Sequence, residues 1–272
     1  FHNNHANLFG KCSTLHLSDM GSKHSENTID AVEKALEFGA DMAEIDLRRT
    51  KDNKIVVFHD QELSCKTNTK GLVIGHTYDE LKKLDAYYRL SFDGGNTFPF
   101  RGRGVGEIRE LSDYIEKFSN TPFHFNPKGK SRAEVEALIP YLALMTKEAR
   151  RRSYFWGNYR QYKYIKSNFP EFGPYLTNGW QSLQCLNFIK IWSKALEWSY
   201  LPSYCQNYKN ITIDVQEYLP LGPDKLSSIF FKHFIQLWGY NVLHPFEMDK
   251  LKRSKWAGII TPKIGSVNEK NR

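Results

Sequence analysis

Hydrophobic positions in the first part of the chain alternate between the spacing of a strand and that of a helix. Strand spacing recurs in short runs, predicted as Ser13–His16, Asp41–Leu47, Ile55–His59, Pro122–Phe125 and Ser153–Gly157. Helical spacing fills most of the intervals, predicted as residues 26–38, Tyr78–Leu84, Glu107–Phe118, Ser131–Thr146 and Gln161–Phe169. This alternation predicts an α/β fold in which helical crossovers join the strands of a parallel sheet.

The polar breaks between these segments favour turns and loops. Residues 51–54, Lys-Asp-Asn-Lys, separate two predicted strands with the chemistry of a hairpin turn. Ser91–Gly104 is rich in glycine and is predicted as a long loop. Pro140 lies in the middle of a predicted helix and is expected to strain it.

The length of the chain agrees with one barrel-sized domain. Its 272 residues exceed an average domain, whereas a single (β/α)8 barrel has about 250. Apolar residues make up 40% and charged residues 25%, enough to build a core. We expect one domain over residues 1–264, followed by a polar tail at residues 265–272.

The net charge of +8 favours anionic partners, such as phosphate groups or an acidic lipid surface. An ordinary basic protein is the alternative interpretation. No nucleic-acid-binding module is recognisable, and no apolar run reaches the roughly 18 residues of a membrane span. The basic runs Lys147–Arg152 and Lys250–Lys255 fit either a contact with an acidic partner or lipid, or solvated helix faces. Residues 180–200 fit a helix that touches a membrane or partner, or an outer helix packed on the barrel.

The four cysteines, Cys12, Cys65, Cys185 and Cys205, are widely spaced and form no CxxC pair. This spacing argues against a zinc ribbon and a dithiol redox motif, and we interpret the cysteines as reduced thiols. The first residue is Phe rather than Met, so we expect that a segment precedes it. A basic chain of this kind is compatible with import into an organelle such as the mitochondrion.

Glu44 and Asp46 are the strongest chemical signal in the sequence. In the predicted strand, alternation puts both acids on one face and Ala43, Ile45 and Leu47 on the other. In an open antiparallel sheet this is a polar outer face. In a barrel, the acids point into the interior, where two close carboxylates repel unless a cation lies between them. The barrel interpretation therefore predicts a hard divalent ion.

His59 and His16 each end a predicted strand, where parallel barrels place their catalytic groups. Two imidazoles beside a metal-bound phosphodiester can serve as general base and general acid. The alternative for any single histidine is an ordinary hydrogen-bonded side chain.

These residues belong to a longer series of short motifs. The series runs through His16, Glu26-Asn27-Thr28, Gly39-Ala40-Asp41, Glu44-Ile45-Asp46, Thr50-Lys51-Asp52, Val56-Val57-Phe58-His59-Asp60, Glu80–Asp85 and Phe98–Gly102. Weaker matches continue through Phe155–Asn158 and Gly258–Thr261. The order and spacing of these motifs resemble the glycerophosphodiester phosphodiesterase family.

The resemblance implies a (β/α)8 TIM barrel that binds Mg²⁺ or Ca²⁺. It also implies hydrolysis of glycerophosphodiesters, or of related lysophospholipids, to an alcohol and a phosphomonoester. Glu44 and Asp46 match two acidic metal ligands of the family, and His59 matches one catalytic histidine. His16 is the candidate for the other histidine.

Several positions depart from the family pattern. The family usually begins with His-Arg-Gly, but here the run is His16-Leu17-Ser18, which lacks the phosphate-binding arginine. Asn126 replaces the third acidic metal ligand, so it offers a carbonyl oxygen but one negative charge fewer. Lys128 is expected to add positive charge near the phosphate. At the end of the chain, Thr261-Pro262 replaces a common Thr-Asp pair.

These losses favour a barrel of weak or absent activity that acts as a structural or interaction subunit of a larger assembly, with protein partners or an anionic membrane surface. The alternative is an active metal-dependent phosphodiesterase. In that case Glu44, Asp46 and Asn126 hold the ion, and His59 and His16 move protons. A sphingomyelinase-D-like lyase shares the barrel and the paired histidines, but no motif favours it.

Overall fold

The computed structural model describes residues 26–91, 93, 95–177, 184–185, 203–206, 208–215, 222–240, 242 and 244–261. Within these residues, strands and helices alternate along the chain, as the hydrophobic pattern predicts. The predicted first strand Ser13–His16, most of the segment at residues 180–200, and the polar tail lie outside the described residues. In the described part, no helix combines the length and apolar character that crossing a bilayer requires.

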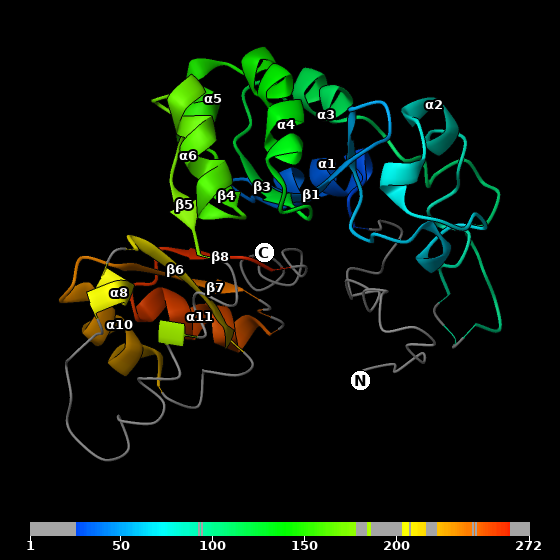
Figure 1. Cartoon of the computed structure of the whole chain (residues 1–272). Coiled ribbons are helices and arrows are strands. Elements are labelled where there is room, and N and C mark those ends of the chain that lie inside the picture. The colour runs from blue at the N-terminus through cyan, green and yellow to red at the C-terminus, as the bar shows by residue number, and fades with distance from the viewer. Residues whose placement is uncertain are drawn as a thin grey trace.

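The first sheet contains five strands in the order β2-β1-β3-β4-β5 (Figure 1). Their bounds are β1 Ala43–Arg49, β2 Ile55–Val57, β3 Phe123–Pro127, β4 Tyr154–Trp156 and β5 Tyr175–Leu176. β2 runs antiparallel to β1, and the other neighbours are parallel. The hairpin turn predicted at residues 51–54 joins β1 to β2, and Asn53 takes the left-handed backbone conformation that asparagine tolerates.

The second sheet contains three parallel strands in the order β6-β7-β8. Their bounds are β6 Asn210–Asp214, β7 Gln236–Tyr240 and β8 Gly258–Ile259. In Figure 1 this sheet lies in the lower half of the molecule, below β5.

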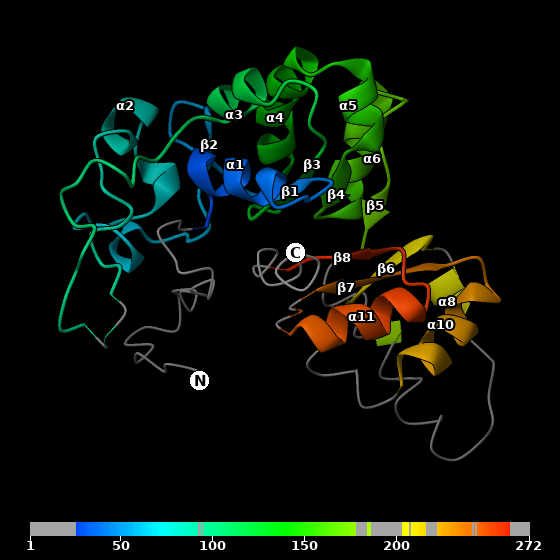
Figure 2. The same ribbon diagram turned by 180° about the vertical axis from the view of Figure 1, so that it is seen from behind.

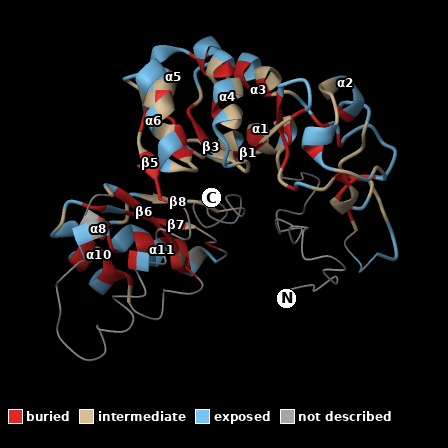
Figure 3. Ribbon diagram, viewed as in Figure 1, coloured by how far each residue is buried: buried red, intermediate tan, exposed pale blue. Residues whose placement is uncertain are grey.

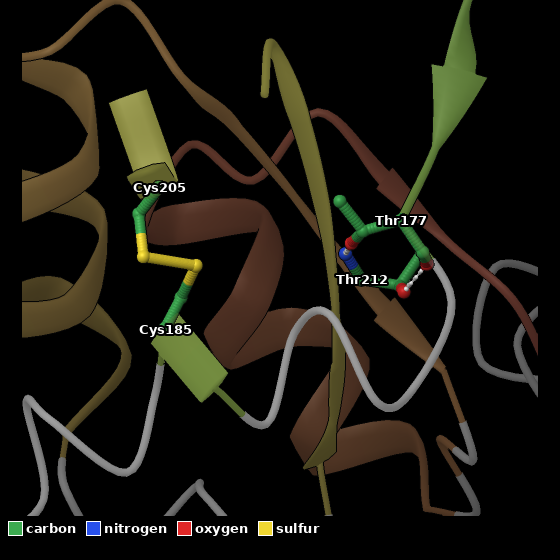
Figure 4. The surroundings of a disulfide bond; sticks show 4 residues. All are labelled: Thr177, Cys185, Cys205 and Thr212. Carbon is green, nitrogen blue, oxygen red and sulfur yellow. Dashed lines mark hydrogen bonds between the residues drawn. A yellow bond between two sulfur atoms is a disulfide. The ribbon is translucent and has the colours of Figure 1, made fainter. Parts of the chain in front are cut away.

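Thr177, directly after β5, joins the two sheets. Its backbone N–H donates to the carbonyl of Asn210 at 3.3 Å. The backbone N–H of Thr212 donates to the Thr177 hydroxyl at 3.1 Å, and the Thr212 hydroxyl donates to the Thr177 carbonyl (Figure 4). The parallel strands of the described residues therefore follow one another in chain order from β1 to β8, with β2 as an antiparallel addition. This is the order of a TIM barrel.

Within the described residues, no ladder joins β8 back to β1, so this part of the barrel is open along that side (Figure 2). Helix α1 Ile29–Glu37 precedes β1. The helices between the strands are α2 Tyr78–Leu81, α3 Leu111–Lys117, α4 Arg132–Leu144, α5 Lys147–Arg152, α6 Tyr159–Asn168, α8 Ser203–Gln206, α10 Pro223–Phe231 and α11 Pro245–Arg253. Two short 3-10 turns, Leu63–Cys65 and Val73–Gly75, lie between β2 and α2.

The helices predicted in the part of the chain that forms the first sheet agree with the observed ones, apart from their ends. The predicted helix at Tyr78–Leu84 is shorter and ends at Leu81. Pro140 lies inside α4, and the helix continues through it to Leu144. The basic run Lys147–Arg152 forms α5, in which Ala149 is buried, Arg150 is half-buried and pairs with Glu171, and Arg151 and Arg152 are exposed.

The core of the first half lies between the outer face of the sheet and its helices (Figure 3). Ala43, Ile45 and Leu47 of β1 pack there with Phe123 and Phe125 of β3. Helices α1, α3, α4, α5 and α6 supply most of the other buried side chains, and β2, β4 and β5 also contribute. Because side chains alternate along a strand, Glu44, Asp46 and Arg48 face the barrel interior. The barrel interpretation of the acidic pair therefore holds over the open-sheet alternative.

The interpretation of the cysteines as reduced thiols is wrong. Cys185 and Cys205 form a disulfide (Figure 4), and Cys65 is also disulfide-bonded. Cys185 and Cys205 are both fully buried in the core of the second half, beside Ile211, Ile213 and Phe230. The wide spacing of the cysteines in the sequence did not exclude a disulfide, because pairing depends on the distance between two cysteines in the fold.

Candidate active site

The acidic pair and the middle of β3 lie side by side because of the strand register. Glu44 pairs with His124, and Asp46 pairs with Asn126. All four side chains share the inward face of the sheet by strand alternation. Lys128 follows directly after β3, and its backbone N–H donates to the Leu47 carbonyl at 3.0 Å. The fold thus brings together four residues that the sequence singled out: Glu44, Asp46, Asn126 and Lys128.

The side chain of Asn126 bridges the two acids. Its Nδ2 donates to Glu44 Oε1 at 2.8 Å and to Asp46 Oδ1 at 2.9 Å. Lys128 Nζ also lies 2.7 Å from Asp46 Oδ1. The chain itself therefore places an amide N–H group and an ammonium where two carboxylates come together.

Asn27 completes the environment of Asp46, although the sequence analysis gave it no role in the site. Its Nδ2 donates to Asp46 Oδ2 at 2.8 Å, and its Oδ1 accepts from the Asp46 backbone N–H at 2.9 Å. Asn27 has a left-handed φ of 60°, and its carbonyl accepts a hydrogen bond from the Tyr114 hydroxyl. The signal that points to Asn27 is its place in the family motif Glu26-Asn27-Thr28.

The two acids differ in their protonation. Burial, and then the charge of Asp46, raise the pKa of Glu44 to about 8, although Lys128 and Asn126 act in the opposite direction. Burial also opposes the ionisation of Asp46, but Lys128, His59 and Asn27 outweigh it and hold the pKa of Asp46 below its ordinary value. Without a bound cation, these opposite shifts favour a proton on Glu44 and a negative charge on Asp46.

His59 lies just after β2, beside Asp46. The backbone N–H of Phe58 donates to the Asp46 carbonyl at 2.9 Å. Arg48 donates twice to the His59 carbonyl, from Nε at 2.9 Å and from Nη2 at 2.6 Å. These bonds fix the backbone of His59, while 32% of its side chain stays exposed.

A buried network that the sequence did not predict supports His59. Its Nδ1 lies 3.4 Å from the Asp60 carboxylate, which in turn lies 3.6 Å from Lys66 Nζ. Lys66 also pairs with Glu26. Asp60 and Lys66 are both buried. If the Asp60 carboxylate accepts the proton on Nδ1, the Nε2 of His59 is left as the proton-exchanging atom.

The predicted partner His16 and the departures at Leu17, Ser18 and Pro262 lie outside the described residues. Their positions relative to His59 therefore stay predictions.

Aromatic side chains form the part of the interior that lies away from the acids. Trp156 ends β4, and Tyr240 ends β7, and their ring centroids are 5.3 Å apart. His124 stacks against Trp156 at 5.4 Å. Burial lowers the pKa of His124 to about 3, so its imidazole is neutral. The carboxyl ends of the strands thus combine a polar half on β1 and β3 with an aromatic half on β4 and β7.

The donor set matches a hard divalent ion in kind, because carboxylate and amide oxygens are the ligands that Mg²⁺ and Ca²⁺ prefer. Glu44, Asp46 and Asn126 would hold the ion. The described residues contain no group of three or more His, Cys, Asp or Glu side chains placed to bind a metal. The set therefore has two carboxylates and one amide, and the N–H side of that amide faces the acids.

Comparison with known proteins finds relatives that match part of the chain. Over 93 residues the chain is 51% identical to a glycerophosphodiester phosphodiesterase of Bacillus altitudinis, covering 34% of this chain and 38% of that protein. Over 158 residues it is 26% identical to human lysophospholipase D GDPD1, covering 57% of this chain and 48% of that protein. Each match thus spans less than half of the curated relative.

The fold extends further than these sequence matches. The crystal structure of a glycerophosphodiester phosphodiesterase from Agrobacterium tumefaciens superposes with a TM-score of 0.62 at 21% identity, over 90% of this chain and 93% of that one. This confirms the predicted TIM-barrel fold. The sequence model of the glycerophosphoryl diester phosphodiesterase family matches residues 20–170, more than half of the chain. The chain therefore belongs to the glycerophosphoryl diester phosphodiesterase family.

Proposed function

We propose that this chain is a family member of weak or absent phosphodiesterase activity, and that its barrel serves mainly as a structural or interaction subunit. The observation that carries this proposal is the amide of Asn126, which donates to both Glu44 and Asp46. The amide thus satisfies both acids that would hold a divalent ion, and Lys128 pairs with the charge of Asp46. The loss of the third carboxylate removes one negative charge from the ligand set, and divalent affinity depends on that charge.

A bound divalent ion would supply Lewis-acid polarisation of the phosphoryl group. Before the acids and the amide can hold it, Glu44 has to lose a proton, and its raised pKa of about 8 opposes this loss at neutral pH. Asn126 has to present its carbonyl oxygen in place of Nδ2. Both requirements weaken metal binding by this site.

The second candidate function is an active phosphodiesterase, and the placement of His59 favours it. Asp60 and Arg48 hold this histidine beside Asp46, while its side chain stays partly exposed. In this role the Nε2 of His59 would exchange a proton with the attacking or leaving oxygen. Lys128 would add positive charge beside the phosphoryl oxygens. Curated relatives carry the names glycerophosphodiester phosphodiesterase and lysophospholipase D, so both substrate types are relevant.

The substitution Asn126→Glu tests the proposal because it restores the third carboxylate. We expect the purified variant to bind Mg²⁺ or Ca²⁺ at least about tenfold more tightly than the natural chain, measured by isothermal titration calorimetry. We expect the natural chain to hydrolyse glycerophosphocholine and lysophosphatidylcholine at least about 100-fold more slowly than the variant, because one preorganised charge contact has an effect of that size. Asn126→Gln, which keeps the amide, is the matched control.

Turnover of the natural chain that matches the Asn126→Glu variant, needs the metal and is lost in His59→Ala would contradict the proposal. That result would establish the second candidate. If both proteins lack turnover, the calorimetry still decides whether Asn126 limits metal binding.

A further inference from the structure

Two phenylalanines project from the last residue of α10 and from the turn that follows it before β7. Phe231 is 79% exposed and Phe234 is 92% exposed. Among the large hydrophobic side chains of the described residues, the next most exposed is Phe246, at 59%. We call the segment Phe231–Phe234 the aromatic turn. It precedes the first residue of β7, whereas the candidate active site lies at the carboxyl ends of the strands.

The aromatic turn has a fixed backbone. Hydrogen bonds from the backbone N–H groups of Phe234 and Ile235 reach the carbonyls of Phe231 and Phe230 at 3.0 and 3.1 Å. Phe230 and Ile235 are buried in the core of the second half, next to Leu226 and Ile229 of α10. The apolar face of α10 is thus already packed, and Phe231 and Phe234 are not part of it.

Phenylalanine at position 234 has a conformational cost. Its φ of 58° is left-handed, which costs a bulky residue about 1 kcal/mol and suits Asn or Gly better. The exposed ring of Phe234 gains no packing energy that would offset this cost. We therefore look for the role of Phe234 outside the folding of this domain.

The charge around the turn is positive. Lys232 lies between the two phenylalanines and is exposed, as is Lys225 on α10. The backbone N–H of Gln236 donates to the Lys209 carbonyl at 2.8 Å, which brings a third exposed lysine next to the start of β7. The single acid between residues 222 and 236 is Asp224, whose carboxylate accepts a hydrogen bond from Ser254.

The size of the exposed apolar surface decides between a protein and a lipid partner. A buried Phe covers at most about 250 Å², so the two rings offer well under the roughly 800 Å² per partner of a stable protein interface. Two aromatic rings next to lysines are instead the composition of a segment that enters the headgroup region of a bilayer. We infer that the aromatic turn anchors this domain to an anionic lipid surface, with the candidate active site at the opposite end of the strands.

Vesicle cosedimentation tests this anchor. We expect the natural chain to bind phosphatidylcholine vesicles that contain phosphatidylglycerol, and to bind pure phosphatidylcholine vesicles more weakly. The double variant Phe231→Ser with Phe234→Asn should lose at least about tenfold in partitioning, since each ring contributes a large apolar area. Its melting temperature should stay equal or rise, because Asn suits the left-handed position. Lys232→Glu should reduce the preference for phosphatidylglycerol.

Phe246→Ser is the matched control, because it removes an exposed ring from the start of α11 and should leave vesicle binding unchanged. The inference is overturned if the natural chain does not bind anionic vesicles, or if the double variant binds as well as the natural chain. It is also overturned if the natural chain binds no lipid and light scattering shows that it is a dimer while the double variant is a monomer. This test does not require catalysis, so it stands or fails separately from the proposed function.

Discussion

At the scale of single residues, the candidate site is defined by how its two acids are satisfied. Asp46 receives hydrogen bonds or ion pairs from Asn27, Asn126 and Lys128, and remains ionised. Glu44 accepts a hydrogen bond from Asn126, and burial and Asp46 raise its pKa to about 8. Substitution of one residue, Asn126, thus changes both the charge and the hydrogen bonding of the site.

The raised pKa of Glu44 predicts a pH dependence of stability. A carboxyl whose pKa rises on folding, here from 4.5 to about 8, binds more protons in the folded than in the unfolded state between those values. The free energy of unfolding therefore falls as the pH rises through this window. Glu44→Gln removes this titration. In the presence of a chelator, we expect the melting temperature of the natural chain, relative to that of Glu44→Gln, to fall from pH 4.5 towards pH 8. A constant difference would contradict the raised pKa.

At the scale of elements, aromatic contacts between β4 and β7 join the two sheets across the interior. Tyr154 and Trp238 have ring centroids 4.6 Å apart, in addition to the pair of Trp156 and Tyr240. Gly258 of β8 leaves room for this arrangement, because a Cβ atom there would collide with the Trp238 ring. These interior rings therefore contribute to the stability of the fold and to the shape of the barrel interior.

We predict that Trp238→Ala lowers the free energy of unfolding by about 3–5 kcal/mol, measured by urea denaturation. A double-mutant cycle with Tyr154→Ala should give a coupling energy of about 1 kcal/mol, the size expected for a packed aromatic pair. Gly258→Ala should also destabilise the protein, by overpacking the same ring. Additive effects of Tyr154→Ala and Trp238→Ala would show that the two rings do not act together.

At the scale of the whole molecule, the disulfides indicate the redox environment in which the protein folds, and the net charge indicates the surfaces that it can approach. The Cys185–Cys205 bond closes a segment with a sequence separation of 20 within the second half. Buried disulfides persist in oxidising compartments. We therefore expect the native form in such an environment, where the positive chain can also reach anionic lipid surfaces.

We predict that Cys185→Ser with Cys205→Ser lowers the free energy of unfolding by about 3 kcal/mol, because a closed segment of this length restricts the unfolded chain. Urea denaturation of the oxidised natural chain and of the double variant measures this difference. Peptide mapping after thiol alkylation without reductant should find Cys65, Cys185 and Cys205 unmodified. Alkylation of Cys185 in the natural chain would contradict the observed pairing.

The sequence by itself determined the α/β alternation and the family. The alternation of Ala43, Ile45 and Leu47 with Glu44 and Asp46 is local, and a strand buried on one face can satisfy it in only one way. The motif series around His59 is equally local. These features therefore predicted the barrel, and with it an interior position for the acids.

Only the tertiary structure decided what surrounds the acids. Glu44 and Asn126 are 82 residues apart, and their hydrogen bond depends on the register between β1 and β3. The same holds for the pairing of cysteines and for the exposure of Phe231 and Phe234. Burial, register and neighbouring charge arise only when distant segments pack. A pattern along the chain could therefore identify the acids but not show which groups of the chain pair with them.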